Sequence, residues 1–124
     1  METFDQKINR AIRYYTNLAG SSDPLEIAKS IGIGIAILPL ENIAGNYKLL
    51  KRKRWIFIND DIPISSTFFK TVVAHELGHA IFHRKENCAF IKKKTLLLTS
   101  GIEREANIFA ARLLITDDML KEYA

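Results

Sequence analysis

The sequence predicts an α+β fold, in which a small three-stranded sheet packs against one apolar helix and further helices. Three observations support this class. Apolar residues recur at helical spacing towards both ends of the chain, and short runs of β-branched and apolar residues lie between them. A long apolar, helix-forming run, residues 67–83, follows those short runs. The chain of 124 residues fits one core, so we expect a single domain over residues 1–124.

The first 32 residues predict two helices. Residues 4–18 carry an apolar stripe at helical spacing, and Gly20 follows as a stop signal. Asp23 as N-cap and Pro24 at the first helical position indicate a second, short helix that ends at Gly32. A helix-turn-helix DNA reader would share this pattern, but simple packing of two helices explains it without any DNA contact.

The middle of the chain predicts the sheet. The strand candidates are residues 33–40, 47–50 and 55–58. Pro39 ends the first strand, and Gly45-Asn46 offers a turn before the second. The basic run Lys51-Arg52-Lys53-Arg54 joins the second strand to the third. It is a candidate nucleic-acid contact, but four charges at a hairpin tip are more typical of a solvated turn that discourages edge pairing.

Two longer helices follow the sheet. Ser65 or Ser66 can cap the helix expected from about residue 67 to residue 83. Ser100-Gly101-Ile102-Glu103 has the form of a capping box, which indicates that Ser100 starts the last helix. The small side chains of Ala106 and Ala110 would let that helix approach the preceding one closely. The insert between them contains Lys92-Lys93-Lys94 and has no pattern that decides its structure.

Composition narrows the class of protein. The net charge of +4 and pI near 9.3 are mildly basic, which a solvated surface explains, so we do not expect direct nucleic-acid binding. The single cysteine, Cys88, excludes an internal disulfide framework and suits a reducing compartment. The start of the chain has no apolar segment typical of a signal peptide, and no run is long enough to span a membrane. We therefore expect a cytoplasmic protein that does not contact membranes.

The helix over residues 67–83 contains His75-Glu76-Leu77-Gly78-His79, the H-E-x-x-H pattern of zinc hydrolases. Residues four apart on a helix lie about 40° from each other, so His75 and His79 can bind one zinc ion. Glu76 is the expected general base. A structural helix with a chance match is the alternative, but the apolar surroundings make two uncompensated histidines costly to bury.

A catalytic zinc ion needs a third protein ligand and an open position. His83 lies about 12 Å along the helix from His75, too far to share the ion. Glu103 is the best candidate, and Asn107 one turn later could hold its carboxylate; the capping box is the competing role for Glu103. Glu105 is the fallback ligand, although it points about 200° away from Glu103, so only one of the two is expected to face the site. Cys88 would favour a closed structural site.

His75-Glu76-Leu77-Gly78-His79, followed by the segment 103–114 with its pattern E-x-E-A-N-x-F-A-x-x-L-L, resembles the ImmA/IrrE family of metallopeptidases. The resemblance extends from about residue 27 to Leu114. It implies a zincin-type active-site helix and a gluzincin-like site. The chain differs in having Thr116 where the family commonly has proline, and it stops at Ala124, whereas relatives often carry further C-terminal helices.

This resemblance also implies a function. Several members of the family act as anti-repressors, which cleave a helix-turn-helix repressor and are encoded by phages and other mobile elements. We therefore expect a zinc-dependent endopeptidase with a DNA-binding repressor as protein substrate. The alternative is a non-catalytic, metal-stabilised module that binds a repressor without cutting it. The donor that stabilises the oxyanion stays open between Tyr47, His83 and Arg104.

Overall fold

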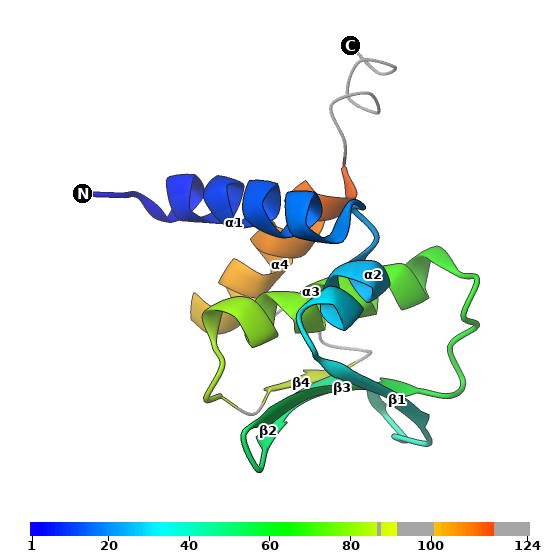
Figure 1. Ribbon diagram of the computed structural model, residues 1–124. Coiled ribbons are helices and arrows are strands. Elements are labelled where there is room, and N and C mark those ends of the chain that lie inside the picture. Colours follow the sequence, from blue (N-terminus) through cyan, green and yellow to red (C-terminus); the bar gives the residue numbers. More distant parts are fainter. Residues whose placement is uncertain (87, 92–100, 116–124) are drawn as a thin grey trace.

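The computed structural model describes residues 1–86, 88–91 and 101–115, with the backbone alone for 88–91. The described elements, in chain order, are α1 (Phe4–Ala19), α2 (Pro24–Ser30), β1 (Gly34–Leu38), β2 (Ile43–Leu50), β3 (Lys53–Asn59), α3 (Thr67–Phe82), β4 (Cys88–Ile91) and α4 (Gly101–Leu114). Helices and a mixed sheet form separate layers, which confirms the predicted α+β class (Figure 1).

The sheet contains the three expected strands and a fourth at one edge. Its order is β1-β3-β2-β4, with β1 parallel to β3 and β2 antiparallel to both β3 and β4. The edges among the described strands are therefore β1 and β4. The sequence did not predict β4 because its four residues are too few for a period to be recognised.

The predicted turn at Gly45-Asn46 is wrong, because both residues lie within β2, where Gly45 pairs with Ile58. A Cβ atom on Gly45 would lie 2.5 Å from Val72 Cγ1 and 3.3 Å from the Cγ atom of Glu76. Any larger side chain would push β2 away from α3. The glycine thus permits close packing of strand against helix rather than a reversal of the chain.

Helix ends follow the predicted capping residues where the structure describes them. Gly20 ends α1 with φ 68°, and the Asp23 side chain accepts from the Leu25 amide at the start of α2. Of the two candidate serines, Ser66 caps α3 by accepting from the Phe69 amide. The predictions for Ser100, for the insert 92–94 and for Thr116 lie outside the described residues.

The helix α3 lies at the centre of the molecule, with the sheet on one side and α1, α2 and α4 on the other (Figure 1). Its residues 72–80 are buried. The contact with α4 is close: a Cβ atom on Gly78 would lie 3.2 Å from both Ala106 Cα and Phe109 Cδ1. The small Ala106 allows this approach, as the sequence suggested. It brings the first turns of α4 beside the histidines of α3. None of the described helices has the length and apolar character that crossing a membrane requires.

Candidate metal centre

Three buried side chains converge between α3 and α4. The Nε2 atoms of His75 and His79 lie 3.2 Å apart. The carboxylate of Glu103 reaches both rings, with Oε2 3.0 Å from His75 Nε2 and Oε1 2.8 Å from His79 Nε2. The three residues are 1%, 0% and 8% exposed. Their donor atoms thus form a small triangle, shielded from solvent.

This triangle fits a metal ion. Bonds of about 2.0–2.1 Å in tetrahedral geometry place two ligand atoms about 3.3 Å apart, close to the three separations above. Two imidazole nitrogens and one carboxylate oxygen are a donor set that zinc accepts, and three protein ligands leave one coordination position open. The group His75, His79 and Glu103 could therefore hold a metal ion.

Hydrogen bonds fix which nitrogen of His75 faces the triangle. His75 Nδ1 lies 2.8 Å from Oδ1 of Asn107. An amide oxygen can only accept, so the proton lies on Nδ1 and the lone pair on Nε2 points to Glu103 and His79. Asn107 was expected to hold the carboxylate of Glu103; in the structure it orients the His75 ring instead.

A second chain of hydrogen bonds orients His79. Its Nδ1 lies 3.0 Å from Nδ1 of His83, and His83 Nε2 lies 2.6 Å from Oε1 of Glu105. The carboxylate accepts from His83 Nε2–H. With His83 neutral, its Nδ1 then accepts from His79 Nδ1–H, which leaves the lone pair of His79 Nε2 on the triangle. Glu105 therefore accepts a hydrogen bond from His83 and does not belong to the cluster of His75, His79 and Glu103.

The sequence reasoning missed this orienting role of His83 and Glu105. His83 is considered there as a zinc ligand, which its distance from His75 excludes, and as a donor to the oxyanion, and Glu105 is considered only as the fallback ligand. The available signal was spacing: His83 follows His79 by one helical turn, as His79 follows His75. The geometry also bears on the other candidates. The Tyr47 hydroxyl donates to the Arg84 carbonyl at 2.6 Å, Arg104 is exposed, and only the backbone of Cys88 is described.

Glu76 is buried beside the triangle with neither oxygen in a hydrogen bond to a described residue. Burial, followed by repulsion from Glu103, raises the pKa of Glu76 well above its ordinary value. A buried carboxyl without a partner is costly, and water, a substrate proton or a cation would compensate it. Because neither oxygen is tied to a described residue, the carboxyl is available to exchange a proton.

The pKa values of the neighbouring Glu103 and His79 are shifted downwards, opposite to the pKa of Glu76. Burial alone would raise the pKa of Glu103, but the imidazoles of His75 and His79 beside it lower that pKa to about 2. Burial lowers the pKa of His79, which favours its neutral form. Glu103 as an anion and His79 as a neutral imidazole are the protonation states that metal binding requires.

Glu76 is expected to contribute less to the stability of the metal-free protein as the pH rises. The pKa of this carboxyl in the folded state lies well above the unfolded value of 4.5. Its contribution to stability is therefore fully present below the unfolded pKa and is lost as the pH rises through the folded pKa. Glu76→Gln removes this titration, while the other groups titrate in both proteins.

The free energy of unfolding by urea is measured for the metal-free wild type and for Glu76→Gln from about pH 4 to about pH 8. We expect the free energy of unfolding of the wild type to fall relative to that of Glu76→Gln as the pH rises. A constant difference across this range would contradict the raised pKa of Glu76.

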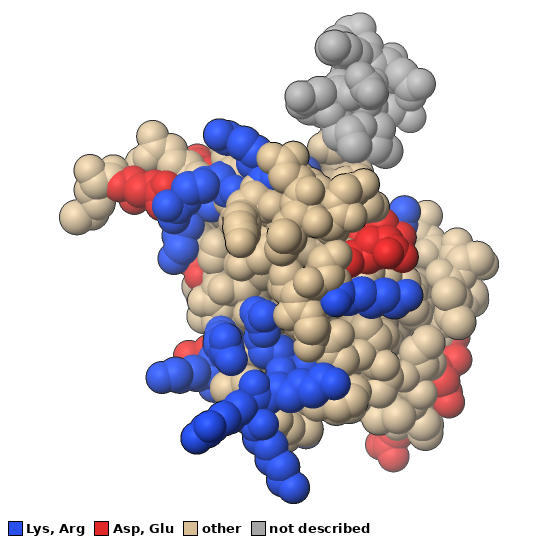
Figure 2. All heavy atoms as spheres, in the orientation of Figure 1, with Lys and Arg blue, Asp and Glu red and all other residues tan. Residues whose placement is uncertain are grey.

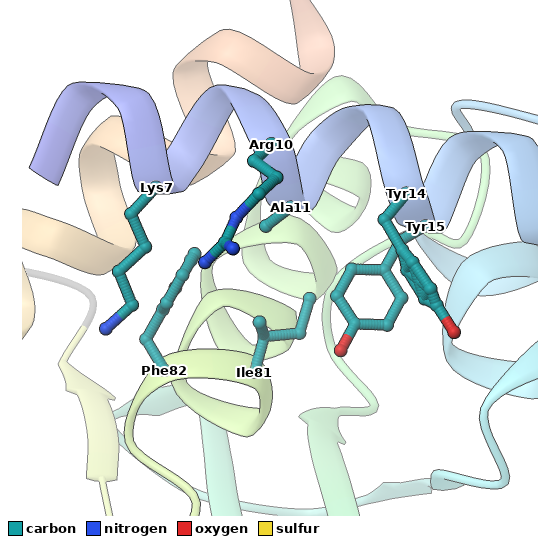
Figure 3. A pocket seen from close by; sticks show the side chains of 7 residues that line it. All are labelled: Lys7, Arg10, Ala11, Tyr14, Tyr15, Ile81 and Phe82. Atoms are coloured by element: carbon teal, nitrogen blue, oxygen red, sulfur yellow. The ribbon is translucent and has the colours of Figure 1, made fainter. Parts of the chain in front are cut away.

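A separate pocket lies between α1 and the last turn of α3 (Figure 3). It has a volume of about 360 Å³, and its lining residues are Lys7, Arg10, Ala11, Tyr14, Tyr15, Ile81 and Phe82. The lysine lies over the ring of Phe82, 5.6 Å from its centroid. The lining includes neither a carboxylate nor an imidazole, so this pocket is distinct from the candidate metal centre.

Comparisons with known proteins agree with the geometry. Residues 28–124 match the model of a peptidase family described as IrrE N-terminal-like domain. The chain is 37% identical over 117 residues to the uncharacterized immunity region protein 2 of Bacillus phage phi105, an alignment that covers 94% of this chain and 70% of that protein. It is 39% identical over 51 residues to the metallopeptidase ImmA of Bacillus subtilis strain 168, which covers 41% of this chain and 30% of ImmA.

Proposed function

Because the chain belongs to the ImmA/IrrE family of metallopeptidases, we propose that it is a zinc-dependent endopeptidase that cleaves a DNA-binding repressor of the helix-turn-helix type. One observation carries the enzymatic part of the proposal: a buried triangle of two imidazoles and a carboxylate lies beside Glu76, whose oxygens have no partner among the described residues. The phage relative is named for an immunity region, and this supports a regulatory protein as substrate.

In this proposal three residues bind the metal ion and a fourth, Glu76, transfers the proton. A zinc ion on His75, His79 and Glu103 would supply Lewis acidity, polarising the scissile carbonyl and lowering the pKa of the attacking water. Glu76 accepts the proton of that water and delivers it to the leaving nitrogen. Its raised pKa suits this shuttle, since the carboxyl must both accept and return a proton near neutral pH.

The sheet offers a way to hold the substrate. An extended peptide can add to an exposed sheet edge by main-chain hydrogen bonds, with pockets for alternate side chains. The edge strand β4 pairs with β2, the strand whose Gly45 packs against Glu76. We therefore place the substrate backbone along β4 and not along β1, which lies on the far side of β3.

His83 acts as a positioning residue in this proposal. Removing its ring with His83→Leu is expected to lower zinc affinity by about 10–100-fold, because His79 loses the acceptor that fixes its tautomer. His83→Asn places an amide oxygen near the former Nδ1 and is expected to recover much of the affinity. The measurement is competition for zinc with a chromophoric chelator. The control is Lys85→Leu, which replaces a neighbouring exposed residue and is expected to bind zinc like the wild type. Equal zinc affinity of His83→Leu and the wild type would refute the positioning role of His83.

The function is tested with a helix-turn-helix repressor from the genome that encodes this protein. Purified protein loaded with zinc is incubated with that repressor, and products are identified by mass spectrometry. We expect one or a few defined cuts that disappear with a chelator and return on adding zinc. An intact repressor in the presence of zinc-loaded protein would refute the substrate assignment. Absence of zinc binding altogether would refute the enzymatic proposal itself.

A further inference from the structure

One face of the sheet carries no described helix. The helices α1, α2, α3 and α4 all lie on the same side of the sheet (Figure 1). Side chains alternate between the two faces along a strand. On β3, Ile56 and Ile58 are buried against α3, and Trp55 and Phe57 therefore point to the opposite face, where both are partly exposed.

The two aromatic rings on this open face form an ordered pair. Their centroids lie 5.9 Å apart, and their planes differ by 9°. Small residues on β1 make room beside them: Gly34 is the register partner of Trp55, and Ala36 is that of Phe57. A Cβ atom on Gly34 would lie 2.4 Å from the Trp55 ring, so the indole covers the backbone of β1 at that position.

Two lysines lie beside the Trp55 ring of this pair, and two further cations lie at the adjacent turn. Lys53 Nζ lies 4.5 Å from the centroid of the Trp55 ring, and Lys48 is the register partner of Trp55 on β2, so its side chain shares the face. Lys51 and Arg52 are exposed at the turn between β2 and β3. Figure 2 shows Lys and Arg side chains gathered over this hairpin at the lower end of the molecule.

Arg54, the last residue of the same basic run, has a different role. Its guanidinium donates to the Ala80 carbonyl at 3.0 Å and to the Ile31 carbonyl at 3.4 Å, on the helical side of the sheet. The run is therefore not one uniform solvated turn. Arg54 holds the ends of two helices, whereas the three cations before it face solvent or the aromatic pair.

The two cations at the turn have a backbone conformation that is unfavourable for long side chains. Lys51 and Arg52 have φ values of 49° and 69°. Two consecutive left-handed residues are typical of a type I′ hairpin turn, for which Asn-Gly is the preferred sequence. Side chains other than glycine, asparagine or aspartate are disfavoured there, so the two cations stand at a cost in conformational free energy.

We propose that this open face, formed by Lys48, Lys51, Arg52, Lys53, Trp55 and Phe57, binds single-stranded nucleic acid. Bases stack against the aromatic pair, and phosphates lie along the cations, the combination that single-strand-binding surfaces use. A duplex would not expose its bases to these rings. The basic run alone favours a solvated turn; the aromatic pair and the strained turn are what the structure adds. This surface is independent of the proposed peptidase function.

The test uses the whole protein and a fluorescent oligothymidylate of about twelve nucleotides, followed by anisotropy at several salt concentrations. We expect the logarithm of wild-type affinity to fall with the logarithm of salt with a slope of roughly −2 to −3, as for about four neutralised phosphates. The key variant is Lys51→Asn/Arg52→Gly, which creates the preferred turn sequence. It is expected to raise the melting temperature by a few degrees while weakening binding at least about tenfold and reducing the slope by about 1.4.

Two further variants complete the test. Trp55→Leu/Phe57→Leu keeps an apolar surface and is expected to weaken binding at least about tenfold. Arg13→Gln/Lys29→Gln removes the same two charges from exposed positions on α1 and α2 and is expected to leave affinity within about twofold. No wild-type binding at low salt, or unchanged binding in both face variants, would overturn the proposal. So would equal binding of an oligoglutamate peptide with no dependence on the aromatic residues, which would assign the face to an acidic protein partner.

Discussion

Glu76→Gln is expected to retain the metal and the fold while lowering the rate of repressor cleavage by about 10²–10⁴-fold. Glutamine has nearly the same shape but cannot accept a proton from the attacking water. The fold should tolerate it, because neither carboxylate oxygen of Glu76 bonds to a described residue. The measurement is the single-turnover cleavage rate, with zinc content determined on the same sample.

The control is Glu26→Gln, which replaces an exposed carboxylate on α2 and is expected to cleave like the wild type. This experiment also decides between the two kinds of protein that the sequence suggests. A non-catalytic module that only grips a repressor would release transcription equally well with glutamine at position 76. Full derepression by Glu76→Gln in cells, together with an intact repressor, would therefore refute the peptidase mechanism.

Much of the fold follows from local signals in the sequence. The caps at Asp23 and Ser66 and the stop at Gly20 are read correctly because each acts within one turn of its own helix. Gly45 was misread because its reason is not local. A glycine in a turn and a glycine under a packed helix look alike in sequence, and only the approach of Val72 distinguishes them.

In the candidate site, too, the sequence predicts what depends on one helix and does not predict what depends on the packing of two. The spacing of His75 and His79 places both on one face of a single helix, so sequence alone indicates their convergence. The choice between Glu103 and Glu105 depends on how α4 is rotated against α3. In the structure both carboxylates reach histidines of α3: Glu103 lies between His75 and His79, and Glu105 reaches His83 one turn further along.

Helical periodicity indicates that only one of the two glutamates faces the site, and in the structure Glu103 lies among the clustered donors. Glu105 nevertheless reaches His83 at the end of the same helix α3. A glutamate side chain is long enough to reach around the helix, and the side chain of Glu105 is 37% exposed, whereas that of Glu103 is 10% exposed. Partial exposure fits a residue that supports the ring of His83, and burial fits a residue among the donors. Such distinctions arise from packing between helices and have no signature in a single sequence.

Removal of the proposed ligands is expected to have the largest effect on metal binding. Elemental analysis of the purified wild type should give about one zinc per chain, and His79→Ala and Glu103→Ala should each lose it, because two remaining donors cannot hold the ion. Glu105→Ala should keep the zinc but bind it more weakly, because His83 loses the carboxylate that orients it.

At a free zinc concentration about a thousand times Kd, the ion stabilises the fold by about 4 kcal/mol. The two ligand variants should therefore also lose the rise in melting temperature that zinc gives the wild type. Zinc retained by Glu103→Ala would move the third ligand to Glu105 or Cys88, and no zinc in any of the four proteins would leave the H-E-x-x-H pattern without its metal.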